Sequence, residues 1–260
     1  MRKTTLRGNT YEEVLAQFHD AFAALARAQG TTADVAGLAH ELRAQNVARG
    51  RPAGDGADVI MADPPWRYAQ EATDAAGNKR AVSAALQGCT PYETMTTAQL
   101  CAMDVAALSG AAPTALLMWA TAPKLNDALA VMRAWGFTYC TVFLVWVKRN
   151  RTNKPILGVG AHTRSNAEFM LVGRRGSIGH LYDQNLRGVT SQILDTNSGR
   201  PRHSEKPPEA RRLVERLFPD TLRAELFTRH RHSGWTGFGD QAGTLGGNAT
   251  QPTLAQLWKA

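Results

Sequence analysis

Cysteine is scarce in this sequence, and the few residues present lie far apart. Cys89, Cys101 and Cys140 form no Cys-x-x-Cys pair, so the sequence indicates neither a disulfide framework nor a zinc site, and we expect free thiols. His230 and His232 stand close together but have no third metal ligand in the surrounding sequence. The sequence therefore predicts a protein without a bound metal.

Long apolar runs are absent, and basic residues outnumber acidic ones. No stretch reaches the roughly 18 apolar residues of a membrane span, and the segment after Met1-Arg2-Lys3 is polar, unlike a signal peptide. We therefore expect an intracellular, cytoplasmic chain with no membrane partner. The 30 Lys and Arg against 22 Asp and Glu give a formal net charge of +8. This balance favours a polyanionic partner such as nucleic acid, although an arginine-rich proteome would produce the same bias.

The 260 residues, of which 43% are hydrophobic and 20% charged, suffice for one large α/β domain with small additions. We expect a helical element over residues 1–50, a main domain over 51–242 and a tail with a short helix over 243–260. The helical element is predicted to be two helices separated by Gly30, the second of which runs to about Val47. Such a hairpin is more typical of packing or oligomer contacts than of an active site.

The most informative stretch is Asp63-Pro64-Pro65-Trp66, which directly follows the apolar run 58–62. A short apolar and β-branched run predicts a buried strand, and two successive prolines can continue neither a helix nor a sheet ladder. The sequence thus predicts a strand that ends in a rigid turn. In an open α/β sheet the carboxyl ends of the strands bind ligands, so we expect this turn to line a site.

The residues of this turn suit methylation of an exocyclic amine on a planar base. The lone pair of such an amine is delocalised into the ring, and two acceptors aimed at its N–H bonds would make the nitrogen more nucleophilic. The Asp63 carboxylate and the Pro64 carbonyl, fixed by the locked φ angles of Pro64 and Pro65, are those acceptors. Trp66 either offers a face on which an extruded base stacks or packs as a lid on the core. With a sulfonium methyl donor, Asp63 also stabilises the charge that develops on the nitrogen.

With these residues the sequence resembles the Asp-Pro-Pro-Trp class of S-adenosylmethionine-dependent N6-adenine methyltransferases. This MT-A70 family includes the catalytic subunit of the eukaryotic messenger-RNA adenine methylation complex and smaller phage and bacterial members, and we expect this chain to be one of the latter. The resemblance runs from about Asp58 to Gln241. The later motifs that carry it are Trp119-Ala120-Thr121, Trp135-Gly136-Phe137, Val145-Trp146-Val147-Lys148, His203-Ser204-Glu205-Lys206-Pro207, Glu225-Leu226-Phe227-Thr228-Arg229 and Gly239-Asp240-Gln241.

The resemblance implies a binding site for the cofactor S-adenosylmethionine. In the family the lysine that corresponds to Lys206 contacts the methionine carboxylate of the cofactor, and a lysine at a helix N-terminus suits an anion. Relatives bind the ribose with the strand-end arginine, the loop after it and a closing Asn-Gln, where this chain has Asp240-Gln241. The cofactor residues expected here are Asp63, Lys206, Glu225, Arg229, Arg231, His232, Asp240 and Gln241.

Aromatic and basic residues near the predicted strand ends are candidates for substrate contacts. Tyr68, ahead of a polar stretch over 70–90 that we expect to be a long loop, either stacks near the base or lies on the surface. The basic run 148–154 leaves a strand where we expect the substrate, so phosphate contact is favoured over a solvated loop. Glu168 orients the substrate, pairs with Lys206 or is a solvated residue at a strand start. The substrate residues expected are Trp66, Tyr68, Lys148, Arg149, Arg151, Lys154 and Glu168, and the catalytic residues are Asp63, Pro64, Pro65 and Trp66.

The catalytic turn precedes the cofactor-binding strand, which is the permuted arrangement of one group of amino-methyltransferases. We therefore predict an α/β, Rossmann-like doubly wound methyltransferase fold in permuted order, with a small N-terminal helical element. The predicted reaction transfers a methyl group from S-adenosylmethionine to the N6 amine of adenine in nucleic acid, with DNA favoured over RNA. A homodimer or a partner subunit stays open. The alternatives are a non-catalytic family member that binds nucleic acid or scaffolds a partner, a cytosine N4 methyltransferase, and a small-molecule or protein methyltransferase.

Overall fold

The computed structural model describes most of the predicted main domain and the second predicted N-terminal helix. The first predicted N-terminal helix and the predicted helix of the tail lie outside the described residues, as do Arg151, Arg229, Asp240 and Gln241 of the predicted site. The described residues are 31–68, 71–73, 79–81, 94–150, 152–158, 162–188, 190–196, 205–228 and 230–239.

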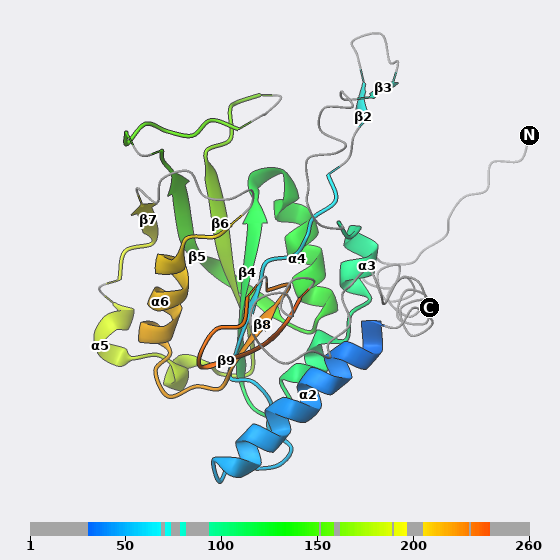
Figure 1. Ribbon diagram of the computed structural model, residues 1–260, viewed down its shortest axis with the longest axis vertical. Coiled ribbons are helices and arrows are strands. Elements are labelled where there is room, and N and C mark those ends of the chain that lie inside the picture. Colours follow the sequence, from blue (N-terminus) through cyan, green and yellow to red (C-terminus); the bar gives the residue numbers. More distant parts are fainter. Residues whose placement is uncertain are drawn as a thin grey trace, which may run out of the picture.

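A sheet of seven strands in the order β7-β5-β6-β4-β1-β8-β9 forms the centre of the molecule (Figure 1). Neighbouring strands are parallel except at β6, which runs antiparallel to both β4 and β5. The strands are β1 (Val59–Ala62), β4 (Thr114–Thr121), β5 (Thr138–Lys148), β6 (Ala167–Arg175), β7 (Ile193–Thr196), β8 (Arg223–Leu226) and β9 (Trp235–Phe238). The predicted α/β fold is confirmed.

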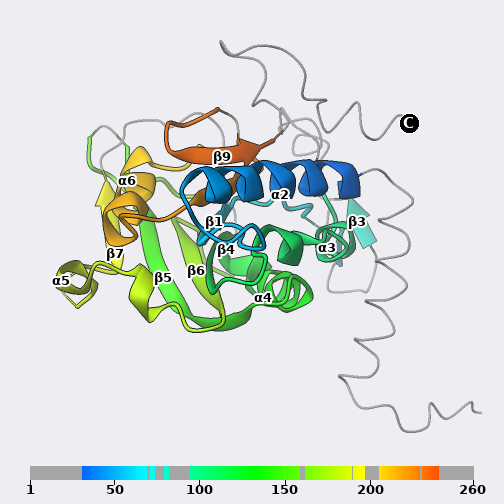
Figure 2. The same ribbon diagram turned by 90° about the horizontal axis from the view of Figure 1, so that it is seen from below.

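Alternating side chains of the central strands join two separate hydrophobic cores, as the two-residue period of a strand requires. On β1, Ile60 and Ala62 pack in the core that includes residues of α2, α3 and α4, whereas Val59 and Met61 pack in the core that includes α6. Figure 2 shows α4 and α6 on opposite sides of the sheet. Helices thus cover both faces, which is the doubly wound arrangement and explains why β1 is buried throughout.

Two of the predicted helices are present with nearly the expected bounds. The second N-terminal helix is α2. The sequence after Lys206-Pro207-Pro208 also predicts a helix that opens at Glu209, and this is α6, which starts with Pro208 at a position where the missing N–H of proline costs nothing. None of the described helices has the length and apolar character needed to cross a membrane. The helices and 3-10 turns of the core are α2 (Thr31–Ala48), α3 (Thr97–Cys101), η2 (Val105–Leu108), η3 (Ala122–Lys124), α4 (Leu125–Ala134), η4 (Gly179–Leu181), α5 (Gln184–Arg187) and α6 (Pro208–Leu217).

The sequence also predicts one helix from Thr97 to about Leu108, and this prediction is wrong in its length. The α3 helix stops at Cys101, and a separate 3-10 turn follows after a break. The indole Nε1 of Trp135 donates a hydrogen bond of 2.7 Å to the Leu100 carbonyl. Trp135, at the end of α4, thus bonds a carbonyl that would accept a hydrogen bond within the helix if α3 were longer. The periodicity of the sequence does not reveal such a contact between distant residues.

Two further elements differ from the sequence-based expectation. The stretch 70–90, expected to be a loop without structure, contains the short antiparallel pair of β2 (Glu71–Thr73) and β3 (Lys79–Ala81). The edge strand β9 was not predicted, although it pairs in parallel with β8. Gly237 interrupts its apolar pattern, because a Cβ at this position would lie 2.9 Å from the Glu225 carbonyl oxygen.

A buried carboxylate anchors the amino end of β1. Arg51 donates two hydrogen bonds of 2.6 Å to Asp58, and the Leu222 N–H donates a third of 2.7 Å. Because Asp58 is fully enclosed, we predict that Asp58→Asn lowers the free energy of unfolding by about 3–5 kcal/mol, as urea denaturation would measure. A loss below about 1 kcal/mol would contradict this structural role.

Candidate active site

The Asp63-Pro64-Pro65-Trp66 turn leaves the carboxyl end of β1 and is held by backbone hydrogen bonds. The Trp66 N–H donates to the Pro64 carbonyl over 2.8 Å, and the Met95 N–H donates to the Pro65 carbonyl over 2.7 Å. The proline rings fix φ at both central positions. The Pro64 carbonyl keeps a second lone pair, so a substrate amine can also donate to it. The rigid turn predicted from the sequence is therefore present.

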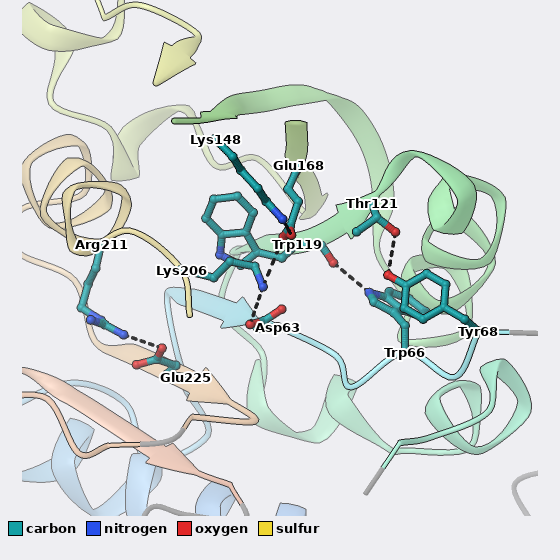
Figure 3. Close-up of polar contacts among 10 residues, drawn as sticks. All are labelled: Asp63, Trp66, Tyr68, Trp119, Thr121, Lys148, Glu168, Lys206, Arg211 and Glu225. Atoms are coloured by element: carbon teal, nitrogen blue, oxygen red, sulfur yellow. Dashed lines mark hydrogen bonds and ion pairs between the residues drawn. The ribbon is translucent and has the colours of Figure 1, made fainter. Parts of the chain in front are cut away.

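The structure corrects the stacking role predicted for Trp66. Its side chain is 7% exposed and belongs to the core, and its indole Nε1 donates to the Trp119 carbonyl over 3.2 Å. A base cannot stack on a ring that is already enclosed, so Trp66 is a lid on the core. Tyr68, beside the turn, is 46% exposed. Its hydroxyl shares a hydrogen bond of 2.8 Å with Thr121 (Figure 3). Lys124 Nζ lies 5.6 Å from its ring centre.

Four charged side chains of alternating sign lie in a row at the carboxyl edge of the sheet (Figure 3). In order, this row of charges consists of Asp63, Lys206, Glu168 and Lys148. Lys206 Nζ lies 2.7 Å from Asp63 Oδ2 and 3.3 Å from Glu168 Oε2. Lys148, at the end of β5, pairs with the other carboxylate oxygen of Glu168. Of the alternatives for Glu168, the structure has the pairing with Lys206, and the side chain is buried rather than solvated. Four residues expected at the site thus form one chain of contacts.

This row of charges changes the proton affinity of its central members. Burial opposes the charged form of Glu168, but Lys206 and Lys148 outweigh it and hold the pKa of this carboxyl below its ordinary value. Burial also opposes the charge of Lys206, yet Asp63 and Glu168 raise its pKa above the ordinary value. Both side chains are therefore charged at neutral pH.

We predict that Glu168→Gln lowers the free energy of unfolding at pH 7 by about 3 kcal/mol, because two lysines lose a buried counter-charge. The folded pKa of Glu168 is depressed, so its contribution is present above the ordinary carboxyl pKa and is lost as the pH falls through the folded value. The difference between wild type and variant should shrink below about pH 4. Urea denaturation at neutral and acid pH measures it, and a difference independent of pH would contradict the pairing.

A second ion pair lies near Asp63, between α6 and β8. Arg211 Nη2 donates to Glu225 Oε1 over 2.7 Å (Figure 3). Burial raises the pKa of Glu225 against the opposing effect of Arg211, and the charge of Asp63 adds to the rise. Glu225 Oε2 and Arg211 Nε are buried without a hydrogen-bond partner among the described residues. Buried groups left unpaired in this way favour a site for a polar ligand.

The backbone beyond β8 has two features of a ligand-binding edge. Phe227 has a φ of 63°, a left-handed conformation that is uncommon outside glycine and clusters at functional sites. Gly239 lies so close to Thr228 that a Cβ would stand 2.1 Å from the Thr228 carbonyl oxygen. A cofactor with an amine, a carboxylate and ribose hydroxyls fits these donors and acceptors, with Lys206 suited to the carboxylate and Glu225 to the hydroxyls.

The remaining predicted residues that the structure describes have other surroundings. Arg149 Nε pairs with Asp195 over 2.5 Å at an exposed position. Lys154 and Arg231 are exposed to solvent. The ring of His232 is 6.4 Å from that of His230, and burial together with Arg211 lowers the pKa of His232. None of these residues has a described contact with the row of charges.

Two residues of the site were missed from the sequence. Arg211 holds Glu225, and Trp119 lies with its ring 5.6 Å from Lys206 Nζ and its carbonyl on Trp66. Arg211 is a basic residue beside the apolar stripe of an amphipathic helix, which is a detectable pattern but does not name its partner. Trp119 belongs to a motif of the family resemblance, but an aromatic residue on a buried strand is equally typical of the core.

Three features define the class of this protein as an amino-methyltransferase of permuted order: the doubly wound sheet, the carboxylate on the proline turn after β1, and the lysine that faces it. Comparison with known proteins supports this class. The sequence matches the MT-A70 family over residues 57–241, and the chain belongs to this family. S-adenosylmethionine is the methyl donor of MT-A70 methyltransferases.

Relatives with assigned names include a type II methyltransferase, M.MunI, from Mycoplasma sp., which is 31% identical over 70% of this chain and 76% of its own length. A putative N(6)-adenosine-methyltransferase MT-A70-like protein from Medicago truncatula is 29% identical over 70% of this chain. The human N(6)-adenosine-methyltransferase catalytic subunit METTL3 is 26% identical over the same share. The chain spans only 26% and 28% of the lengths of the plant and human proteins.

Proposed function

We propose that this chain transfers a methyl group from S-adenosylmethionine to the N6 amine of adenine in DNA. The observation that carries the proposal is the Asp63 carboxylate on a rigid proline turn, facing Lys206 at 2.7 Å. This arrangement offers fixed acceptors for the two N–H bonds of an amine, and a cation beside them for an anionic cofactor tail.

In the proposed reaction the residues of this edge bind and orient the reactants. When bound, S-adenosylmethionine supplies a methyl group on an electrophilic sulfonium. Asp63 and the Pro64 carbonyl accept the hydrogen bonds of the adenine amine and direct its lone pair out of the ring plane. Asp63 also stabilises the positive charge that develops on the nitrogen. Lys206 holds the cofactor carboxylate, and Glu225 with the residues after β8 holds the ribose.

On the substrate side, Tyr68 takes the stacking role in place of the buried Trp66. An exposed tyrosine ring next to the catalytic turn suits an extruded base, at about 1–3 kcal/mol for each stacked base. Arg149, Arg151 and Lys154 are proposed contacts to the phosphate backbone. DNA is favoured over RNA because the Mycoplasma relative, a type II methyltransferase, is matched over most of its length, whereas the adenosine methyltransferases are matched over about a quarter.

The test is incorporation of labelled methyl from S-adenosylmethionine into double-stranded DNA, single-stranded DNA and RNA, followed by nucleoside analysis. N6-methyladenine in DNA alone supports the full proposal, whereas label in RNA alone overturns the DNA preference. Label recovered as N4-methylcytosine would overturn the base assignment. Cofactor binding without label in any polymer would favour a scaffold that needs a partner subunit.

A further inference from the structure

Lys148 has a fixed position inside the row of charges, although the sequence places it in a basic run typical of phosphate contacts. The Lys148 N–H donates to the Asn166 carbonyl over 2.8 Å, and the Ile156 N–H donates to the Lys148 carbonyl over 2.9 Å. Its ammonium pairs with Glu168 and lies 5.2 Å from the ring centre of Trp146, the residue that faces Glu168 across β5 and β6. The charged end of Lys148 thus points into the protein.

The position of Lys148 matters because Glu168 needs a counter-ion. Glu168 is 6% exposed, so its negative charge requires a close cation. Lys206 is within reach of both carboxylates, at 2.7 Å from Asp63 and 3.3 Å from Glu168. If Glu168 had Lys206 as its sole counter-ion, the lysine would be drawn away from Asp63, because an uncompensated buried charge costs more than an exposed one.

We propose that Lys148 is a positioning residue: it neutralises Glu168 so that Lys206 stays beside Asp63, available to an anionic cofactor tail. The inference rests on the proposed cofactor role of Lys206. It assigns Lys148 to the geometry of the cofactor site rather than to the nucleic-acid backbone, and it makes Glu168 the residue through which Lys148 acts.

The experiment measures S-adenosylhomocysteine binding by calorimetry to the full chain and to variants. Lys148→Met is expected to raise the dissociation constant about tenfold, the effect of one weakened hydrogen bond to a charged group, and Lys148→Arg is expected to restore most of the affinity. In a Glu168→Gln background the same Lys148→Met change should alter affinity less than about twofold, since no buried charge is left to capture Lys206. The control Arg187→Met removes a cation that lies over the ring of Tyr182, outside the row of charges, and should leave the affinity unchanged.

Salt dependence of DNA binding separates the proposal from a phosphate contact. A lysine on a phosphate contributes about 0.9 to the slope of log Kd against log salt concentration, so Lys148→Met should leave the slope of wild type unchanged. A slope reduced by this amount, with unaltered S-adenosylhomocysteine affinity, would overturn the inference. Equal effects of Lys148→Met with and without Glu168 would also overturn it, and Lys148→Gln serves the same test if the methionine variant does not fold. Wild type that binds no S-adenosylhomocysteine would instead overturn the proposed function.

Discussion

Asp63→Asn is expected to reduce kcat for adenine methylation by a factor of about 10²–10³, the usual cost of removing one preorganised group that stabilises developing charge. Asparagine keeps the size of the side chain and one acceptor oxygen, so the amine can still bind. It lacks the negative charge that stabilises the nitrogen as it becomes positive. The loss should therefore fall on kcat more than on the KM for nucleic acid.

Cofactor affinity is expected to change far less than kcat, by about tenfold, since Asp63 contributes one charged contact to Lys206 among several at that edge. The measurement combines steady-state methyl transfer with calorimetry of S-adenosylhomocysteine. Asp183→Asn is the matched control, because Asp183 caps α5 by accepting from the Asn185 and Leu186 N–H groups, which asparagine can also do, and has no described contact with the turn. Methyl transfer within about threefold of wild type in Asp63→Asn would contradict the catalytic role.

The sequence predicted the parts of the site that depend on local chemistry. Two prolines after a β-branched run predict the end of a strand, and the structure has the turn there. That Asp63 and Lys206 can meet is consistent with the fold class, because they follow β1 and β7, two parallel strands whose carboxyl ends lie on the same edge of the sheet. The family resemblance supplied the lysine, and the sheet order supplies the contact.

What the sequence could not predict depends on which side chain fills a given space. Trp66 could face the solvent or the core, and the carbonyl of Trp119, 53 residues away in sequence, decides for the core. Glu168 could be solvated or paired, and the register that sets it opposite Trp146 encloses it. Arg211 was missed because helix periodicity places a side chain on a face but does not reveal that a buried glutamate of β8 lies opposite.

The two ends of β1 show how similar residues acquire different roles. Asp58 and Asp63 flank β1, and both pair with a basic side chain. Asp58 has its donors fixed by Arg51 and by the backbone of Leu222 at the amino end, where a parallel sheet seldom binds ligands. Asp63 stands at the carboxyl end and is more exposed, with a side chain that a substrate can reach. Position on the strand, rather than residue type, separates the structural carboxylate from the candidate catalytic one.

Lys206→Met is expected to weaken S-adenosylhomocysteine binding about 10- to 100-fold, because the cofactor carboxylate loses a charge-assisted hydrogen bond of about 1.5–3 kcal/mol. The same change leaves the buried Glu168 with Lys148 as its described partner. It also removes the cation that lies between the carboxylates of Asp63 and Glu168. We therefore also expect the free energy of unfolding at pH 7 to fall by about 3 kcal/mol.

The two effects of Lys206→Met are separable by pH and by a second variant. Without Lys206, burial acts on Glu168 against less opposition, so the pKa of this carboxyl rises and the loss of stability shrinks as acid protonates it. Lys206→Arg keeps the charge but changes its shape, so it should recover stability more fully than cofactor affinity. Calorimetry and urea denaturation measure the two quantities, with Arg187→Met as the control. Affinity within about twofold of wild type in Lys206→Met would show that the cofactor carboxylate is held elsewhere, and the ion pair with Asp63 would then be structural.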